Sequence, residues 1–415
     1  MTINRRLHIG LALVTLVAAT TATRGQTAPE PVVISPLASP AAAGSAQPQL
    51  TVSDRGVLLS WIERAGTTAM LKFAERTAAG WTQPRQVASG ADWFVNWADV
   101  PSVIRLADGS IYGHWLQKSG ASTYAYDVRL ARSTDDGKTF APSFTPHHDG
   151  TQTEHGFASL FQMPGTGLGL AWLDGRAMKS GGHDGHDSGG AMSIRSAIYD
   201  RTGKQTAELP IDLRVCECCP TAVAVTADGP IVAYRDRSDD EIRDIYVSRL
   251  IAGKWTTPVA VHNDDWKIAA CPVNGPALSA DGQRVAIAWF TAKGDQGHAF
   301  AAFSSDSGAS FGPPIRLDDA SALGRVDVQL LADGAAMATW IEFADGGAQF
   351  KARRVEPSGQ TGAAISVAGL NASRSSGYPR MARSGNELVF AWTEAGDTPG
   401  VRTAVVRLPA ASTRQ

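Results

Sequence analysis

The sequence predicts an all-β protein folded as a seven-bladed β-propeller, and three observations lead to this prediction. A short apolar segment that ends in an aromatic residue occurs seven times. Successive occurrences are separated by 51 to 62 residues, and self-similarity at such a period is typical of radial or linear arrays. Further strand-like segments flank each occurrence, as in the four-stranded blades of a propeller. The aromatic residues are Trp61, Trp115, Trp172, Tyr234, Trp289, Trp340 and Trp392.

Each repeat begins with a short strand that ends in a tight turn. In four repeats this turn contains Asp-Gly, at 108–109, 228–229, 281–282 and 333–334. Glycine accepts the positive φ that such hairpin turns require, so the aromatic segment that follows is expected to pair with the first strand.

Two more strands complete the expected blade. The third strand alternates polar and apolar residues, at 126–133, 192–200, 244–251, 298–305 and 348–355. The fourth contains proline, at 81–88, 139–146, 255–262 and 310–317. Proline lacks the N–H of a ladder donor, so these segments fit the outermost edge of each blade.

The last repeat supplies only three strands. We expect residues 31–37, near the N-terminus, to provide the missing fourth strand of this blade. That pairing joins the two ends of the domain and removes the open edge of the ring. A six-bladed ring is the alternative arrangement.

Residues 1–25 have the features of a secretory signal peptide, with Arg5 and Arg6 before an apolar stretch at 7–19. Residues 26–415 would then form a single propeller domain in the periplasm or outside the cell. The apolar stretch is too short to predict a membrane span. The formal charge of −2 gives no electrostatic reason to expect a nucleic-acid partner.

Two segments, 133–140 and 304–311, match the S-x-D-x-G-x-[ST]-[FW] pattern of an Asp box. With this motif between third and fourth strands, the chain resembles the sialidase-like BNR-repeat propeller superfamily. A degenerate version occupies the same place at 76–81. The Asp and Ser side chains of the box satisfy backbone N–H groups of a turn, so we interpret the boxes as marks of the fold and not of catalysis.

All four cysteines lie in two loops on the face where a propeller normally carries its binding site. Cys216, Cys218 and Cys219 are in the loop that leads into blade four, and Cys271 is in the loop that leads into blade five. Cys219 and Cys271 each precede a proline and hold equivalent positions in adjacent blades. We therefore expect these two loops to bring their sulfur atoms close together.

Three interpretations of this cysteine group remain open. An inter-blade disulfide would suit an exported protein. Sulfur and imidazole ligands would suit copper or zinc, with His155, His183 and His186 as further candidate ligands from blade three. A redox-active thiol group that exchanges disulfides is the third interpretation.

The position two residues after each aromatic is acidic in five of the seven repeats. The residues are Glu63, Gln117, Asp174, Asp236, Thr291, Glu342 and Glu394. They are either solvated strand ends or a ring of charge that attracts a cation or a polar ligand.

The resemblance to sialidases implies a tyrosine nucleophile assisted by glutamate, with arginines that hold a substrate carboxylate. The residues of those types are Tyr378, Glu394, Arg176, Arg235 and Arg380. The Arg-Ile-Pro motif of the family is absent, and the inner strand of blade one at 48–54 has no arginine. Tyr378 can instead be a packed residue of the channel. Arg176 can instead be a partner of Asp174, and Arg235 a partner of Asp236.

Trp93 and Trp97 lie on the loop into blade two. They either cap the inner apolar layer or stack on a sugar ring.

The leading functional hypothesis is the binding of a metal ion or another small ligand by the cysteine-rich site. The alternatives are an exo-sialidase or related glycoside hydrolase that acts on a glycan, and a structural or protein-docking propeller with an inter-blade disulfide.

Overall fold

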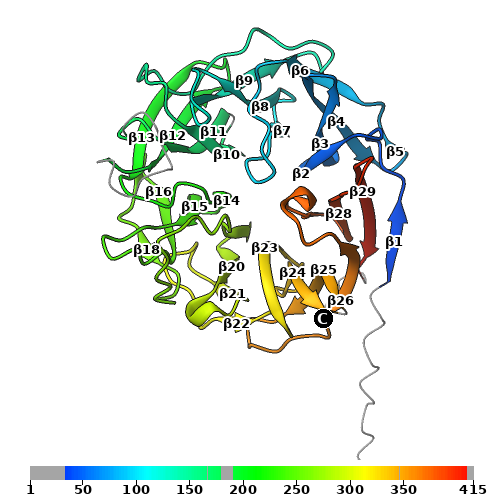
Figure 1. Ribbon diagram of the computed structural model, residues 1–415, viewed down its shortest axis with the longest axis vertical. Helices are drawn as coiled ribbons and strands as arrows, with labels where there is room; N and C mark the ends of the chain where they lie inside the picture. The colour runs from blue at the N-terminus through cyan, green and yellow to red at the C-terminus, as the bar shows by residue number, and fades with distance from the viewer. Residues whose placement is uncertain (1–32, 166, 179–189, 345, 409–415) are drawn as a thin grey trace, which may run out of the picture. The chain divides into compact units, whose positions relative to one another are not determined.

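The computed structural model describes residues 33–165, 167–178, 190–344 and 346–408. These residues belong to one compact unit, and within them the chain forms seven antiparallel sheets placed as blades around a common axis (Figure 1). The seven-bladed prediction is therefore confirmed, and the six-bladed alternative is wrong. Helical structure in the described part is limited to the short 3-10 turns η2 (Lys293–Asp295) and η3 (Arg374–Ser376).

The blades follow one another in chain order. Blade one contains β2 (Ala46–Ser53), β3 (Gly56–Ala65), β4 (Thr68–Thr77), β5 (Gly80–Trp81) and β6 (Arg85–Gly90). Blade two contains β7 (Ser102–Arg105), β8 (Ile111–Lys118) and β9 (Tyr126–Ser133). Blade three contains β10 (His155–Gln162), β11 (Gly167–Asp174), β12 (Ser193–Asp200) and β13 (Gln205–Asp212). Blade four contains β14 (Ala222–Thr226), β15 (Gly229–Arg235), β16 (Ile245–Ile251), β17 (Lys254–Trp255) and β18 (Val259–Ala260).

The last three blades repeat the pattern. Blade five contains β19 (Ala277–Asp281), β20 (Arg284–Thr291), β21 (His298–Ser304) and β22 (Ile315–Arg316). Blade six contains β23 (Ser321–Leu330), β24 (Ala336–Ala344), β25 (Gly347–Val355) and β26 (Ile365–Leu370). Blade seven contains β27 (Arg380–Ser384), β28 (Glu387–Glu394), β29 (Gly400–Arg407) and β1 (Ile34–Leu37).

The N-terminal strand closes the ring, as predicted. β1 pairs antiparallel with β29, from Ile34 opposite Val406 to Leu37 opposite Thr403. Ile34 and Leu37 pack against the apolar clusters of blade seven, so closure buries apolar surface as well as completing the ladder.

The outermost strand is the least regular part of each blade. In blades one and four it is split in two, and Pro84 and Pro258 lie in the gaps. In blade two the expected strand at 139–146 is reduced to a bridge between Phe144 and Leu130, so the described sheet has three strands. Pro142 and Pro146 flank this bridge, and neither can donate to the ladder.

The recurrent aromatics are structural residues of the blades. Trp61, Trp172 and Trp340 are fully buried, and the indole N–H of each donates to the carboxylate two residues later on the same strand. The donor–acceptor distances are 2.7 Å to Glu63, 2.9 Å to Asp174 and 2.8 Å to Glu342. Residues i and i+2 of a strand share a face, so the tryptophan and the acid are placed side by side in these three blades.

Both sequence-based explanations of the acidic positions therefore fail where this bond forms. Glu63, Asp174 and Glu342 are buried partners of an indole, neither solvated strand ends nor a ring open to a cation. Glu394 is different, because it is exposed and pairs with Arg402.

The Asp boxes act as turn devices, as the sequence predicts. In the blade-five box the Asp306 carboxylate accepts hydrogen bonds from the Ser304 hydroxyl at 2.7 Å and from the Ser310 N–H at 3.0 Å. The blade-two box repeats this arrangement on Asp135. In both boxes the residue before the glycine has a positive φ, 67° at Asp136 and 58° at Ser307.

In the described part of the chain, no helix has the length and apolar character that a bilayer crossing requires. The predicted signal peptide, residues 1–25, lies outside the described residues.

Candidate functional site

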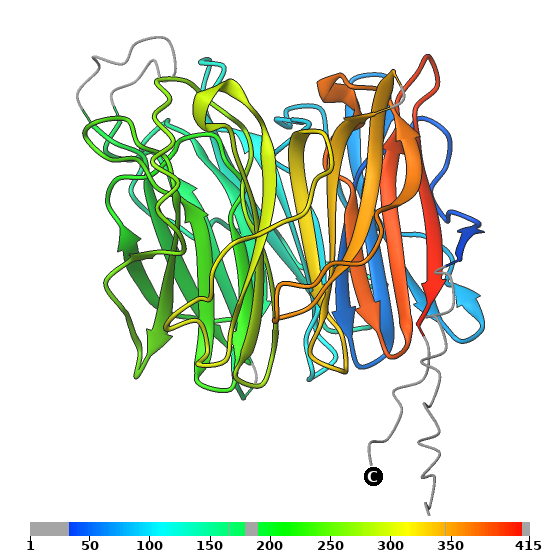
Figure 2. The same cartoon turned by 90° about the horizontal axis from the view of Figure 1, so that it is seen from below.

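Candidate ligand side chains gather on one face of the ring, which we call the top face. It is formed by the loops from second to third strands and by the loops that enter each blade. Figure 2 shows the ring from the side, with the loops that carry η2 and η3 at the same rim. Cys216, Cys218, Cys219, Cys271 and His155 all lie on loops or strand ends of this face.

Three cysteine sulfurs converge in the loop that enters blade four. The Cys216 Sγ lies 3.1 Å from the Cys219 Sγ and 3.8 Å from the Cys218 Sγ. A disulfide requires about 2.05 Å, and the structure contains no disulfide between the four cysteines. All three residues are buried among apolar side chains that include Met192 and Tyr234.

Cys271 completes the group from the adjacent blade. Its thiol interacts with that of Cys218 and contributes to the raised pKa of Cys218. The two loops approach so closely that a Cβ on Gly275 would lie 1.9 Å from the carbonyl oxygen of Pro220. Unlike the other three cysteines, Cys271 is exposed, so the group opens to solvent on its side.

A buried guanidinium sets the charge of this group. The Arg243 Nη1 lies 3.3 Å from the Cys216 Sγ and 2.9 Å from a Glu217 carboxylate oxygen. Burial alone would raise the pKa of Cys216, but hydrogen bonds from Cys218 and Cys219 together with the Arg243 charge hold it well below its usual range. Hydrogen bonding to Cys216 raises the pKa of Cys218, and burial raises that of Cys219. These shifts favour a thiolate on Cys216, beside the two other sulfurs.

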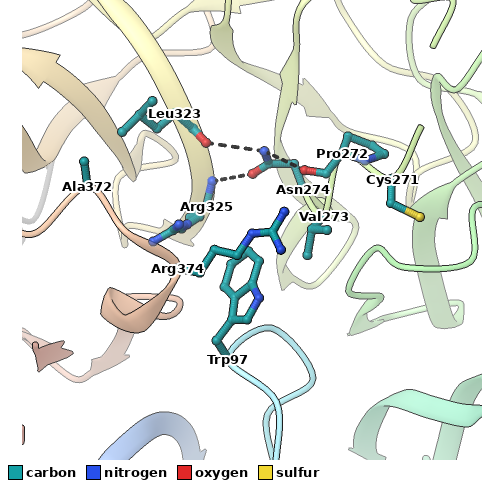
Figure 3. A pocket seen from close by; sticks show the side chains of 9 residues that line it. All are labelled: Trp97, Cys271, Pro272, Val273, Asn274, Leu323, Arg325, Ala372 and Arg374. Atoms are coloured by element: carbon teal, nitrogen blue, oxygen red, sulfur yellow. Dashed lines mark hydrogen bonds between the residues drawn. The ribbon is translucent and has the colours of Figure 1, made fainter. Parts of the chain in front are cut away.

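A small pocket opens on the top face, and Cys271 is one of the residues that line it (Figure 3). Its volume is about 180 Å³, below the ~300–1,000 Å³ typical of sites for drug-sized ligands. The lining residues are Trp97, Cys271, Pro272, Val273, Asn274, Leu323, Arg325, Ala372 and Arg374.

The pocket combines an aromatic face with two cations. The guanidinium carbons of Arg325 and Arg374 lie 4.8 Å and 5.8 Å from the centroid of Trp97. Asn274 fixes the opposite wall, because its Oδ1 accepts from the Arg325 N–H at 2.8 Å and its Nδ2 donates to Leu323 O (Figure 3). Val273 and Arg325 have φ values of 48° and 54°, so backbone strain is concentrated at this wall.

The two tryptophans of the blade-two loop have different roles. Trp93 stacks on Trp115 at 5.3 Å between centroids and belongs to the apolar core. Trp97 stacks on Tyr378 at 5.9 Å and lines the pocket.

The structure gives the five residues suggested by the resemblance to sialidases different partners. Tyr378 is 2% exposed and donates its hydroxyl to the carbonyl of Val273, and burial raises its pKa. Arg380 lies over the Tyr378 ring, so these two residues are together. Glu394 is on β28 in an exposed pair with Arg402.

The other two arginines have structural partners. Arg176 pairs with Asp174, as predicted, with its Nε 2.7 Å from Oδ1. The prediction that Arg235 pairs with Asp236 is wrong. Its guanidinium donates to three main-chain carbonyls, of Asn274, Arg243 and Phe290, and thereby ties blade four to blade five.

His155 lies in a separate group of ligand-type side chains. It is fully buried and is near Asp127, Asp149 and Asp174, and its ring stacks on His147. No cysteine belongs to this group of described residues, so the structure does not support His155 as a ligand at the cysteine site. Contacts with Asp127 and Asp149 outweigh burial and raise the pKa of His155 to about 9. His183 and His186 lie outside the described residues.

Sequence reasoning missed His147, Asp149 and Asp127. The available signal was the His-His-Asp-Gly run at 147–150, which stands in a top-face loop eight residues before His155. It also missed Arg243, Arg325 and Arg374, which are single arginines without a motif.

No protein-family model matches the chain, and no curated protein is similar to it at a significant level. Among solved structures, a protein of unknown function from Dyadobacter fermentans superposes with a TM-score of 0.52 at 13% identity, over 91% of this chain and 98% of its own. The polysaccharide lyase Uly1 gives a TM-score of 0.52 at 12% identity over 94% of both chains. These similarities show that the chain shares the β-propeller fold of the polysaccharide lyase Uly1.

The NanB sialidase of Streptococcus pneumoniae also superposes, with a TM-score of 0.44 at 9% identity over 91% of this chain and 94% of its own. Identities of 12–13% show a shared fold alone, because function depends on the site that each chain builds on that fold.

Proposed function

We propose that this sialidase-like propeller binds a thiophilic metal ion, Cu(I) or Zn²⁺, through Cys216, Cys218 and Cys219, with Cys271 as a fourth ligand. The observation that carries the proposal is the convergence of sulfurs from two blades. Sulfurs on a tetrahedral zinc ion with bonds of about 2.3 Å lie about 3.8 Å apart. The Cys216–Cys218 separation already has this value, and Cys219 has only to move outward.

The surroundings suit a soft cation. One thiolate supplies the first bond, and the two neighbouring thiols lose their protons as the metal binds. Thiolate sulfur selects Cu(I) and Zn²⁺ over Mg²⁺ or Ca²⁺. Cys271, at the exposed side, gives the ion a route of entry and release.

The test is metal titration of the anaerobically purified full chain, with thiol counting before and after denaturation. We expect one Cu(I) or Zn²⁺ per chain. Cys216→Ser should abolish this binding, because Cys216 contacts both other buried sulfurs. Cys271→Ser should only weaken it. Absence of bound metal together with absence of titratable thiols would replace the metal site with two disulfides, which together use all four cysteines.

A second function is favoured by the Trp97 pocket, which we propose binds an acidic sugar unit. Arg374 lines the pocket beside Trp97, and a guanidinium there suits the carboxylate or sulfate group of such a sugar. A hydrolytic step by Tyr378 is not supported, because its hydroxyl is buried and bonded to main chain.

Calorimetric titration with uronic acid-containing oligosaccharides tests the pocket. Arg374→Ala should reduce affinity at least about tenfold, as expected for the loss of a charged hydrogen bond. Arg402→Ala, which alters an exposed arginine of blade seven, is the control. If Arg374→Ala and Arg402→Ala bind the oligosaccharide with equal affinity, the pocket is not the sugar site.

A further inference from the structure

A second ligand group lies on the top face between blades two and three. Asp127 is at the start of β9, His147 is in the loop that follows, and His155 begins β10. The Asp127 Oδ1 lies 3.4 Å from the His155 Nδ1 and 3.8 Å from the His147 Nε2. The two imidazoles are nearly parallel, with centroids 3.8 Å apart and an interplanar angle of 6°.

Three polar atoms of this group lie close together but form no hydrogen bonds with one another. The Asp127 Oδ1, the His147 Nε2 and the His155 Nδ1 are all buried, and none makes a hydrogen bond of acceptable geometry. His155 is 0% exposed and His147 is 6% exposed. Buried polar atoms without partners are rare and costly, so three of them around one point indicate that a bound group is accommodated there.

The far nitrogens of both rings face a single carboxylate. The Asp149 Oδ2 is 3.1 Å from the His147 Nδ1 and 3.2 Å from the His155 Nε2. The Thr151 N–H and hydroxyl hold the other Asp149 oxygen. A proton on the His147 Nδ1, which is hydrogen-bonded to Asp149, leaves a lone pair on the Nε2 that faces Asp127, and this is how an outer carboxylate orients a metal-bound histidine.

The charge of the surrounding network also calls for a cation. Four carboxylates, of Asp127, Asp149, Asp174 and Glu208, are linked to two guanidiniums, of Arg176 and Arg195. With neutral imidazoles this described network carries two negative charges. A divalent ion would balance both.

We propose that His147, His155 and Asp127 bind a divalent transition-metal ion such as Zn²⁺, Fe²⁺ or Mn²⁺, with Asp149 as the outer carboxylate. Two imidazoles and one carboxylate form an N/O ligand set that is harder than the cysteine group. Three protein ligands also leave coordination positions for water or a substrate oxygen, on the side where Asp127 is 22% exposed. This site shares no residue with the proposed thiolate site and does not depend on it.

The experiment uses the full chain carrying Cys216→Ser, which removes the proposed thiolate site, after removal of metal with a chelator. Zn²⁺ and Co²⁺ are then titrated. We expect one ion per chain and an X-ray absorption spectrum with nitrogen and oxygen ligands only. Asp149→Asn should lower the affinity by about 10–100-fold, and Asp127→Asn should lower it further.

His148→Ala is the matched control, because His148 is adjacent to His147 but is exposed and contacts only Gln205. It should bind like the wild type. The proposal is overturned if Asp127→Asn, shown to be folded by circular dichroism, binds the ion as tightly as this control. It is also overturned if no ion binds and NMR shows a charged His155 imidazolium, because a closed charge network then explains the cluster.

Discussion

Asp99 illustrates how a single buried carboxylic acid makes the stability of this protein depend on pH. It is 1% exposed, and one of its oxygens accepts the Phe157 N–H at 2.8 Å while the other has no partner. Burial raises the pKa of Asp99 to about 8, and the nearby charge of Glu154 adds to the effect. The folded state therefore holds a proton on Asp99 that the unfolded chain releases near pH 4.

The sign of the effect follows from linkage. A carboxyl group whose pKa is raised in the folded state adds fully to the free energy of unfolding at pH values below its unfolded-state pKa. This added stability is lost as the pH rises through about 8. We predict that Asp99→Asn, which keeps an acceptor for Phe157, is more stable than wild type at about pH 9 and gains little at about pH 4. Urea unfolding at both pH values measures the difference. The exposed Asp54→Asn should track the wild type, and parallel curves for all three proteins would contradict the prediction.

For single residues, the sequence predicts a contact only when the alternation of side chains along a strand determines it. The tryptophan and the acid two residues later share a strand face, so their bond follows from alternation. Arg235 and Asp236 are consecutive, so they point to opposite sides, and Arg235 reaches carbonyls of the next blade. That partner depends on how blades pack, which a single sequence does not encode in any local pattern.

At the scale of the element, the Asp-box turn is a self-contained unit. In blade five its hydrogen bonds join Ser304, Asp306 and Ser310, and a positive φ at Ser307 completes the bend. A Cβ on Gly308 would lie 2.1 Å from the side chain of Ile231, so the turn also packs against blade four. The motif could be recognised from sequence because all of its polar partners lie within seven residues.

We predict that Asp306→Ala lowers the free energy of unfolding by about 0.5–2 kcal/mol, by analogy with the loss of a capping carboxylate. Thermal denaturation measures this loss. Metal binding on the top face should be unchanged, because the box lies at the opposite end of the strands. A variant that lost metal binding without losing stability would show that the boxes have a role beyond the fold.

The two candidate sites differ in how far the sequence could predict them. The cysteine group could be predicted because its loops occupy equivalent places in adjacent repeats. The Asp127 cluster could not, since its ligands come from the third strand of one blade, a loop and the first strand of the next. Only the packing of blade two against blade three brings those carboxylate and imidazole groups together.

At the scale of the whole molecule, β1 is a strand of four residues on which closure of the ring depends. It supplies the outer edge of blade seven, and the Thr403 hydroxyl donates to Leu37 O at 2.9 Å across 366 residues of sequence. We predict that a variant starting at residue 38 is about 2–4 kcal/mol less stable than one starting at residue 33, mainly from the loss of Ile34 and Leu37 burial.

Chemical denaturation and light scattering test this prediction. The shorter variant leaves β29 as an unpaired edge, so it should also associate with increasing concentration. Identical unfolding curves and a monomeric state for both variants would mean that β1 is dispensable.

The same pairing imposes an order of events on biosynthesis. Blades one to six can each form as soon as their own consecutive segments have emerged, because their contacts are local. β1 is made first, yet its partner is among the last segments made, so it has to wait for nearly the entire chain. In a translation product that ends before β29, β1 therefore has no partner strand and the ring of blades stays open. Chaperones and proteases can recognise such an incompletely folded chain.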